Sequence, residues 1–475
     1  MNILGGMKQY RPYEPMQAYL LPPDPRDWLP EGHLALFVMD VVATLDLSAI
    51  YRVYESGDGR GQPPYHPMMM TSLVLYGYCT GKVSSRRLEG ATYEEVPYRV
   101  IAGGQHPDHD SIADFRQRHL GSLSKLFVQV LELCREAGLI KLGHVALDGT
   151  KVKANASKHK AMSYGRMKET EKRLEEEVRK LLEEAACVDA EEDAKYGKGK
   201  RGDELPEELK HRESRLKKIR EAKAALEAEA KAEAEAAAAE ALEKVAERER
   251  KEAETGKKMR GRKPGVPNAG DAEPEAKSQK NFTDAESRIM KDGATKEFVQ
   301  GYNGQAAVDS GSQVIVASDV TQEANDKQQL VPLLGKVKEN VGRLPDKVSA
   351  DSGYFSEKNL TDESIKEVDL YVPPDRQKHG TSLENESVGT AEDGTVKGRM
   401  KQKLKTAEGR AVYKMRKAIV EPVFGQMKEI RGFRRFSFRG LVKVSAEWDL
   451  VCMGHNLLKL FRSGWRPGMS AAVPA

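Results

Sequence analysis

The sequence predicts an α/β fold with an all-α N-terminal domain before it and a long antiparallel helical hairpin inserted within it. A strand pattern at 142–153 gives way to residues rich in Ala, Glu, Lys and Arg, and strand patterns return only after residue 281. Ala, Glu, Lys and Arg favour helix, so the intervening segment reads as helical. A chain of 475 residues is long enough for two or three domains.

Composition excludes several classes of protein. The net charge is +4 and the mean hydropathy is −0.62, which is polar for a globular chain but does not name a partner. There is no apolar run of about 18 residues, as a membrane span needs, and no signal-peptide pattern at the N-terminus. The 4 cysteines are scattered without a Cys-x-x-Cys pair, which argues against disulfide frameworks and zinc ribbons. We therefore expect a cytoplasmic protein.

Residues 1–140 are predicted to form the helical domain. Pro67 suits the first turn of a helix that stops at Gly81, and Asp110 or Ser111 is placed to cap a longer helix with a break near Gly121. Several short helices joined by turns suit a helix-turn-helix-like DNA-binding domain, but they suit a small helical bundle equally well.

Residues 160–255 are predicted to form the hairpin. Met167, Leu174 and Leu181 recur at heptad spacing as in a coiled coil, and Pro206 opens a second helix. The hairpin suits dimerisation or DNA contact, but a solvated insertion at a surface loop is the interpretation that the pattern favours. Residues 256–280 are rich in Gly, Pro and Lys and are predicted to be a flexible linker.

Residues 141–159 and 281–465 are predicted to form one catalytic domain. Two strands flank a turn at Asp309, a further strand ends at Asp351, and Asn325 or Asp326 is placed to cap the helix between them. The insertion should leave the first strand paired with the second in space.

Three carboxylates stand out by position. Asp148 and Asp351 each follow a predicted strand, and Glu421 lies in a predicted helix. Taken singly, each aspartate is better explained by a common turn or a helix cap. Together, two or three such oxygen ligands suit Mg²⁺ or Mn²⁺, and a pair of these ions can activate a water or a hydroxyl for attack on a phosphodiester.

Three segments carry a resemblance to a known family. ALDGTKVKANAS, SADSGYF and YKMRKAIVEPVFGQMK resemble, in this order, the signature segments of DDE transposases of bacterial insertion sequences. The third segment of that family reads Tyr, two residues, Arg, three residues, Glu, six residues, Lys. Here Tyr413, Glu421 and Lys428 match, but four residues separate Arg416 from Glu421, so that Lys417 has the family's spacing.

The resemblance covers most of the chain outside the hairpin and implies a site. It implies an RNase H-like catalytic domain in which Asp148, Asp351 and Glu421 hold Mg²⁺ or Mn²⁺, as two ions. Lys428 lies two helical turns beyond Glu421, within reach of a terminal phosphate beside the metals, and Tyr413 shares roughly that face.

A basic stretch overlaps the third segment. From Lys397 to Lys443 there are 15 Lys or Arg residues and 3 acidic ones. Phosphate contacts are expected from it, with binding that weakens as salt rises, unless its phenylalanines are core and its arginines only solvated. The DNA-binding residues that we predict are Tyr413, Arg416, Lys417, Arg431, Arg434, Arg435 and Arg439.

The resemblance implies a metal-dependent DNA transposase. It would cut DNA at the terminal inverted repeats of its element and join the ends to target DNA, as a nucleoid-associated protein and a homodimer in the synaptic complex. Two alternatives remain at this point: a non-catalytic DNA-binding or scaffold protein of the same family, and an RNase H-like nuclease that does not transpose.

Overall fold

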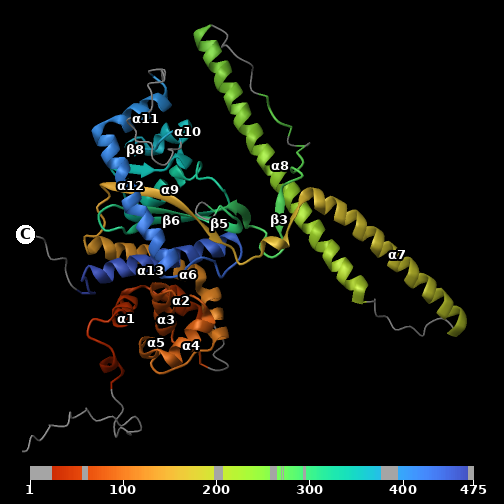
Figure 1. Cartoon of the computed structure of the whole chain (residues 1–475), viewed down its shortest axis with the longest axis horizontal. Helices are drawn as coiled ribbons and strands as arrows, with labels where there is room; N and C mark the ends of the chain where they lie inside the picture. Colours follow the sequence, from red (N-terminus) through yellow and green to blue (C-terminus); the bar gives the residue numbers. More distant parts are fainter. Residues whose placement is uncertain are drawn as a thin grey trace, which may run out of the picture. The chain divides into compact units, whose positions relative to one another are not determined.

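A computed structural model describes residues 24–55, 63–196, 207–256, 265–268, 270, 272–292, 296–375 and 394–468. The chain divides into two compact units (Figure 1). The N-terminal unit comprises Met1–Ser122 and Leu460–Ala475, and the sheet unit comprises Leu123–Lys459.

The N-terminal unit is helical, as predicted. Its α3 begins at Pro67 and is closed by Gly81, which adopts a positive φ of 82° that glycine tolerates best. The break expected near Gly121 does not occur, because α6 continues through it. The helices are α1 (Leu34–Thr44), α2 (Ser48–Glu55), α3 (Pro67–Thr80), α4 (Ser85–Glu94), α5 (Val96–Ile101) and the first half of α6 (His109–Glu136).

One pair of helices in the described ranges, α1 and α2, has the length and composition of a membrane span when taken together. No single helix there is long and apolar enough to cross a bilayer, and α1 with α2 passes that test only as a pair bent by 72°.

A six-stranded mixed sheet forms the centre of the sheet unit. Its order is β4-β5-β1-β7-β8, with β6 also paired to β5. β1 runs antiparallel to β5 and parallel to β7, and β7 runs parallel to β8. The strands are β1 (His144–Lys153), β4 (Arg288–Lys291), β5 (Phe298–Asp309), β6 (Ile315–Thr321), β7 (Lys347–Ala350) and β8 (Asp369–Tyr371).

Helices pack on this sheet and complete its core. α9 packs on β5 and β6, and α12 packs on β1, β7 and β8. Trp448 of α13 is buried and its Nε1 donates to the Gln305 carbonyl of β5 at 2.9 Å. The helices of this part are α9 (Leu330–Val341), α10 (Glu357–Leu360), α11 (Val396–Lys405), α12 (Ala407–Gly425) and α13 (Leu441–Arg462), with a π-helical turn at Gln426–Ile430.

The topology confirms the predicted fold class. Three antiparallel strands, β6, β5 and β1, are followed by two parallel ones, β7 and β8, with helices on the sheet. This is the strand arrangement of RNase H-like domains. β1 pairs with β5 across the inserted residues, as expected.

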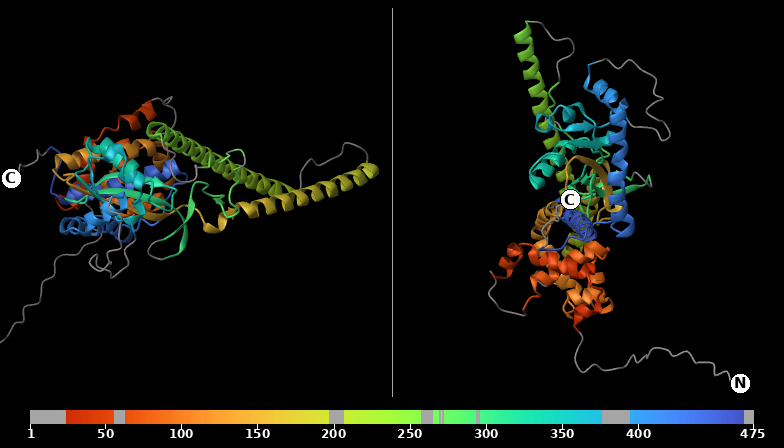
Figure 2. Two further views of the ribbon diagram at one scale, coloured as in Figure 1. Left: turned by 90° about the horizontal axis from the view of Figure 1, so that it is seen from above. Right: turned by 90° about the vertical axis from the view of Figure 1, so that its left-hand side faces the viewer.

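The insertion leaves the domain at the end of β1 and returns beside it. It contains a 3₁₀ turn at Lys158–Lys160, then β2 (Ala161–Ser163), α7 (Tyr164–Tyr196) and α8 (Glu207–Thr255), and it returns through β3 (Gln279–Asn281), which pairs with β2. The left view of Figure 2 shows α7 and α8 extending away from the sheet.

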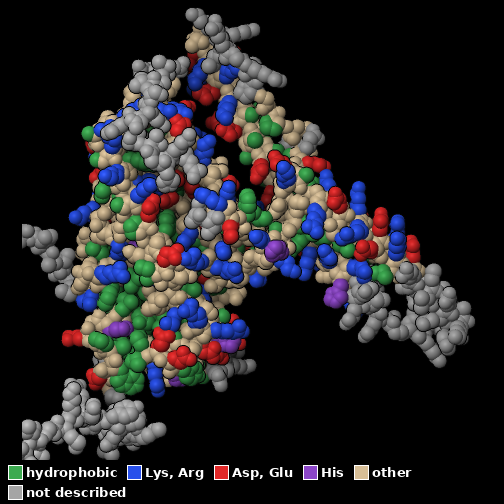
Figure 3. All heavy atoms as spheres, in the orientation of Figure 1, with side chains coloured by type: hydrophobic (Ala, Val, Ile, Leu, Met, Phe, Trp, Pro, Cys, Tyr) green, Lys and Arg blue, Asp and Glu red, His purple; other side chains and the backbone are tan. Residues whose placement is uncertain are grey.

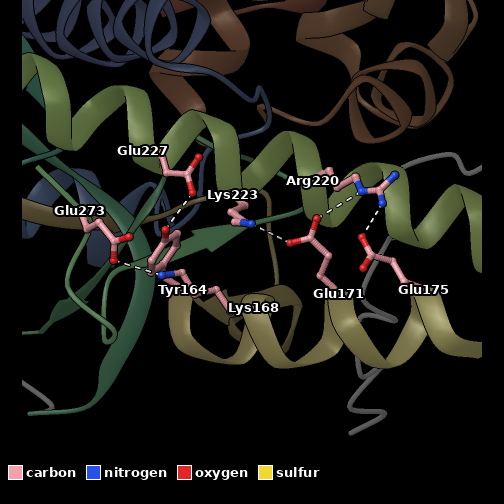
Figure 4. A network of polar contacts seen from close by, with 8 residues as sticks. All are labelled: Tyr164, Lys168, Glu171, Glu175, Arg220, Lys223, Glu227 and Glu273. Carbon is pink, nitrogen blue, oxygen red and sulfur yellow. Dashed lines mark hydrogen bonds and ion pairs between the residues drawn. The ribbon is translucent and has the colours of Figure 1, made fainter. Parts of the chain in front are cut away.

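The first turns of α7 pack antiparallel on the first half of α8. Met167 and Leu174 are buried against Leu216, Ile219 and Leu226, whereas Leu181 is half-buried. Ion pairs flank this apolar seam, from Glu171 to Arg220 and Lys223 at 3.2 and 2.8 Å (Figure 4). The seam is therefore confined to the base of the hairpin among the described side chains.

The expected flexible linker is partly ordered. Residues 257–264 of it lie outside the described residues, but 272–280 pack along the base of the hairpin. Gly165 N donates to the Ala276 carbonyl at 3.1 Å, and Lys168 pairs with Glu273 at 3.1 Å (Figure 4). These two contacts hold residues 272–280 beside the start of α7, just before β3 pairs with β2.

Candidate active site

Asp148 and Asp351 lie side by side on two parallel strands. The last register pair between β1 and β7 is Leu147 with Ala350, and each aspartate is the next residue. Adjacent strands are about 4.8 Å apart, so the two carboxylates occupy one small region. Asp351 follows the end of its strand as predicted. Asp148 does not, because β1 stays paired with β5 as far as Lys153.

A third carboxylate, Asp326, joins these two. It lies between β6 and α9, and its Oδ1 accepts hydrogen bonds from Asn303 and Gln305 of β5, both at 2.6 Å. A Cβ built on Gly149, beside Asp148, would lie 2.6 Å from Asp326 Oδ1. A Cβ built on Gly353 would lie 3.3 Å from Asp326 Oδ2.

Sequence reasoning assigned Asp326 to a helix cap. The N-cap of α9 is instead Gln329, three residues later. The sheet topology indicates where Asp326 lies, because β5 is antiparallel to both β1 and β6. The carboxyl ends of β6 and β1 therefore share one edge of the sheet, and Asp326 follows shortly after β6.

A hydrogen-bonded chain fixes the orientation of this third carboxylate. Tyr354, in the segment after Asp351, donates its hydroxyl proton to Gln305 Oε1, which turns the amide nitrogen of Gln305 toward Asp326. Burial raises the pKa of Tyr354 well above its usual value, so the hydroxyl retains its proton. Tyr354 and Gln305 are thus positioning residues that the sequence did not reveal.

Crowding of the acidic groups is visible in their pKa values. Burial raises the pKa of Asp148 to about 6, and the charges of Asp351 and Asp326 act in the same direction, whereas Arg416 opposes them. Burial and the charge of Asp326 likewise raise the pKa of Asp351. Gathered carboxylates of this kind favour a bound cation.

Arg416 is the cation that contacts the group. Its Nη1 lies 3.0 Å from Asp148 Oδ2, and the side chains of Arg416 and Asp148 are 9% and 20% exposed. The guanidinium also lies over the ring of Tyr413, 5.9 Å from its centroid. Lys417, which has the family's spacing, is exposed on α12 instead. The extra residue in the motif thus leaves Arg416, not Lys417, in contact with Asp148.

Glu421 and Lys428 have different surroundings. Glu421 is exposed on α12, five residues after Arg416, which corresponds to about 140° around the helix. Lys428 lies in the π-helical turn, where its Nζ donates to the Lys151 carbonyl at 2.8 Å and burial lowers its pKa. The π-helical turn interrupts the α-helical spacing between Glu421 and Lys428. The two side chains therefore do not lie two α-helical turns apart on one face, as the sequence predicted.

The predicted DNA-binding arginines divide into buried and exposed. Arg431 is 7% exposed and donates to the Val451 carbonyl at 3.4 Å, which places its charge inside the fold. Arg434 is exposed and pairs with Glu429. Arg435 and Arg439 are exposed beside the end of β1. The neighbouring Phe433 and Phe436 are core residues that pack with Trp448.

The donor set fits a hard divalent cation in chemistry. Asp148, Asp326 and Asp351 supply carboxylate oxygens at one sheet edge, where two glycines without a Cβ let the side chains approach the backbone closely. Across the described ranges, however, no three His, Cys, Asp or Glu side chains surround a common point as a finished metal centre. Arg416 engages Oδ2 of Asp148, and the two amides engage Oδ1 of Asp326.

Comparisons with known families agree with this geometry. Residues 257–457 match the model of the transposase DDE domain, and residues 23–118 match a transposase domain of the N-terminal region. Searches of curated proteins and of solved structures found no match. The two matches correspond to the helical N-terminal unit and to most of the sheet unit after the hairpin. The chain therefore carries two transposase domains, of the kind typical of the DDE transposases of bacterial insertion sequences.

Proposed function

We propose that this transposase cuts DNA at the ends of its element and transfers the freed strand to target DNA. The observation that carries the proposal is the register of Asp148 and Asp351, each one residue beyond the Leu147–Ala350 pair. Both reactions are phosphoryl transfers in which an oxygen nucleophile attacks phosphorus in line, so one site serves both.

Asp148 and Asp351, with Glu421 as the resemblance implies, would hold Mg²⁺ or Mn²⁺, and Asp326 adds a carboxylate to this set. Such ions supply charge neutralisation and an activated oxygen nucleophile. The carboxylates themselves orient the site, because their strands and the Gln305–Tyr354 chain fix where the oxygens point. Glu421 is exposed on α12, where it would be accessible to a bound ion.

Arg416 would serve the phosphate as well as Asp148. Its Nε is buried and has no hydrogen-bond acceptor among the described residues, while its Nη1 binds Asp148. Guanidinium groups bind phosphate and carboxylate with paired N–H donors, so a phosphate oxygen is a suitable missing acceptor. Lys428 would add a further positive charge near Lys151, next to the carboxylates.

Double-stranded DNA is the proposed partner, and the N-terminal unit is proposed to take part in binding it. Synapsis of two element ends calls for at least two copies of the chain, so a homodimer is expected in the active complex. A non-catalytic relative would bind the ends without cutting them, and a simple nuclease would cut without joining.

The test is strand cleavage and strand transfer on paired element ends with Mg²⁺. Asp351→Asn is expected to abolish both products, and Glu421→Gln is expected to do the same while leaving the melting temperature unchanged, because Glu421 is exposed. Asp346→Asn is the matched control, since Asp346 pairs with Arg343 at 3.1 Å just before β7, at the end of that strand opposite Asp351, and it should cut normally. Full activity in Asp351→Asn would remove the catalytic assignment.

A further inference from the structure

Two hollows in the sheet unit adjoin each other where the hairpin leaves the domain. The first has a volume of about 640 Å³ and lies at the end of β1, between Lys158–Lys160, β5 and the segment that holds Arg435 and Arg439. The second, of about 660 Å³, lies between β2 and α8. His159, Lys160 and Thr283 line both, so the hollows form one continuous surface.

This surface is strongly basic. Its lining contains a single acidic residue, Glu297. The Lys and Arg residues that line it are Lys153, Lys158, Lys160, Arg166, Arg215, Lys218, Arg435 and Arg439. Figure 3 shows that the hairpin as a whole carries both signs of charge, so the imbalance belongs to the hollows and not to the helices in general.

The cations of α8 differ in whether they pair with a carboxylate. Arg212 pairs with Glu177, and Arg220 pairs with Glu171 and Glu175, at 3.1, 3.2 and 2.5 Å (Figure 4 shows the latter two). Arg215 and Lys218 line the second hollow, are exposed, and pair with no carboxylate in the described part of the chain. Their charges therefore do not hold the hairpin together.

The position of the surface suits DNA that extends from the active site. β1 runs from Asp148 to Lys153 at the first hollow, a distance of about 17 Å at 3.3–3.4 Å per residue. A B-form duplex carries about one phosphate charge per 1.7 Å, so roughly ten charges lie over that length. A duplex cut at Asp148 that follows β1 would meet this concentration of cations.

We propose that the two hollows bind the phosphate backbone of the duplex beside the cleavage site, which makes the base of the hairpin insertion a DNA-binding element. This inference rests on the proposed function, and it assigns to the insertion a role that a solvated loop would not have. Because Lys and Arg recognise phosphates without reading bases, the contact should be independent of DNA sequence.

The experiment compares two double variants of the full chain. Arg215→Ala/Lys218→Ala removes two cations from the second hollow. Lys217→Ala/Lys231→Ala removes two exposed cations of the same helix that line neither hollow and pair with no carboxylate that the structure describes. Alanine suits a helix and all four side chains are exposed, so both proteins should fold, which circular dichroism checks. The probe is a short duplex of unrelated sequence, titrated at several salt concentrations.

Removing two cations that bind phosphates should flatten the plot of log affinity against log salt by about two units of slope. The Lys217→Ala/Lys231→Ala control should keep the slope of the unaltered protein. An unchanged slope and affinity in Arg215→Ala/Lys218→Ala would overturn the inference. The same result is expected if the surface binds an acidic protein instead of DNA. If the unaltered protein neither binds duplexes nor cuts them, the proposed function fails instead.

Discussion

Arg416 of α12 lies 3.0 Å from Asp148 of β1 and is the cation in contact with a crowded acidic group. Asp148 faces two other carboxylates, Asp351 and Asp326, and burial together with their charges raises its pKa to about 6. The ion pair therefore has an electrostatic role beyond holding α12 on the sheet. It also shows that the arginine of a motif with one extra residue still contacts Asp148.

Replacing Arg416 tests this relationship. Arg416→Ala should lower the free energy of unfolding by about 3 kcal/mol, because removing one partner leaves a largely buried charge unpaired. It should also reduce strand cleavage by at least tenfold, a loss that added Mg²⁺ does not fully restore. Lys417→Ala on the same helix is the control and should change neither quantity, since Lys417 is exposed. Equal effects of the two variants in thermal unfolding and cleavage assays would contradict the assignment.

Asp326→Asn tests the carboxylate that sequence reasoning missed. An asparagine can keep the side-chain oxygen that accepts from Asn303 and Gln305, so the melting temperature should change little. Removing the negative charge should lower strand cleavage by about 10–100-fold, as for groups that orient metal ligands. Asn325→Ala changes the exposed neighbour and should cut normally. Normal cleavage in Asp326→Asn would show that Asp326 only anchors its loop.

Gly149→Ala tests how tightly the site is packed. The added methyl group would lie 2.5 Å from Gln305 Nε2 and 2.6 Å from Asp326 Oδ1, so this network must shift. We expect a loss of about 1–3 kcal/mol in stability and a loss of strand cleavage. Gly335→Ala in α9 is the matched control, since its Cβ would meet nothing within 4 Å, and it should be neutral or slightly stabilising. Thermal unfolding and cleavage, measured on both variants, decide the matter, and an active Gly149→Ala would refute the tight fit.

Ile219→Ala tests whether the hairpin base is a separate packed core. Ile219 is 1% exposed in the seam between α7 and α8, and truncation of such a side chain costs about 2–5 kcal/mol. Amide hydrogen exchange should rise in the packed parts of α7 and α8 and stay unchanged in β1 and β7. Leu242→Ala, at a side chain of the same helix that is 56% exposed, should leave exchange unaltered. Faster exchange throughout the sheet would mean that the hairpin base supports the catalytic fold.

Local patterns in the sequence were sufficient for most of the elements. The helix from Pro67 to Gly81 and the strand before Asp351 follow from caps, turn residues and hydrophobic periodicity, which depend on neighbours in the chain. The pairing of β1 with β5 across the insertion also follows, because the strand before Asp148 needs a partner.

Contacts between residues far apart in the chain could not be predicted from these local patterns. Asp326 resembles a helix cap until the sheet order places the end of β6 at the same edge as Asp148. Arg431 and Arg435 are equally basic in sequence, yet one is buried beside α13 and the other is exposed at the end of β1. Strand order and helix orientation decide such differences.

The sequence by itself determined the succession of helices and strands, the family signature and two of the gathered aspartates. Tertiary structure alone decided that Asp326 joins them, that Arg416 contacts Asp148, and that the base of the hairpin carries cations with no carboxylate partner among the described residues. The physical reason is range: helix and strand propensities act over a few residues, whereas electrostatic contacts depend on distances in space between residues far apart in the chain.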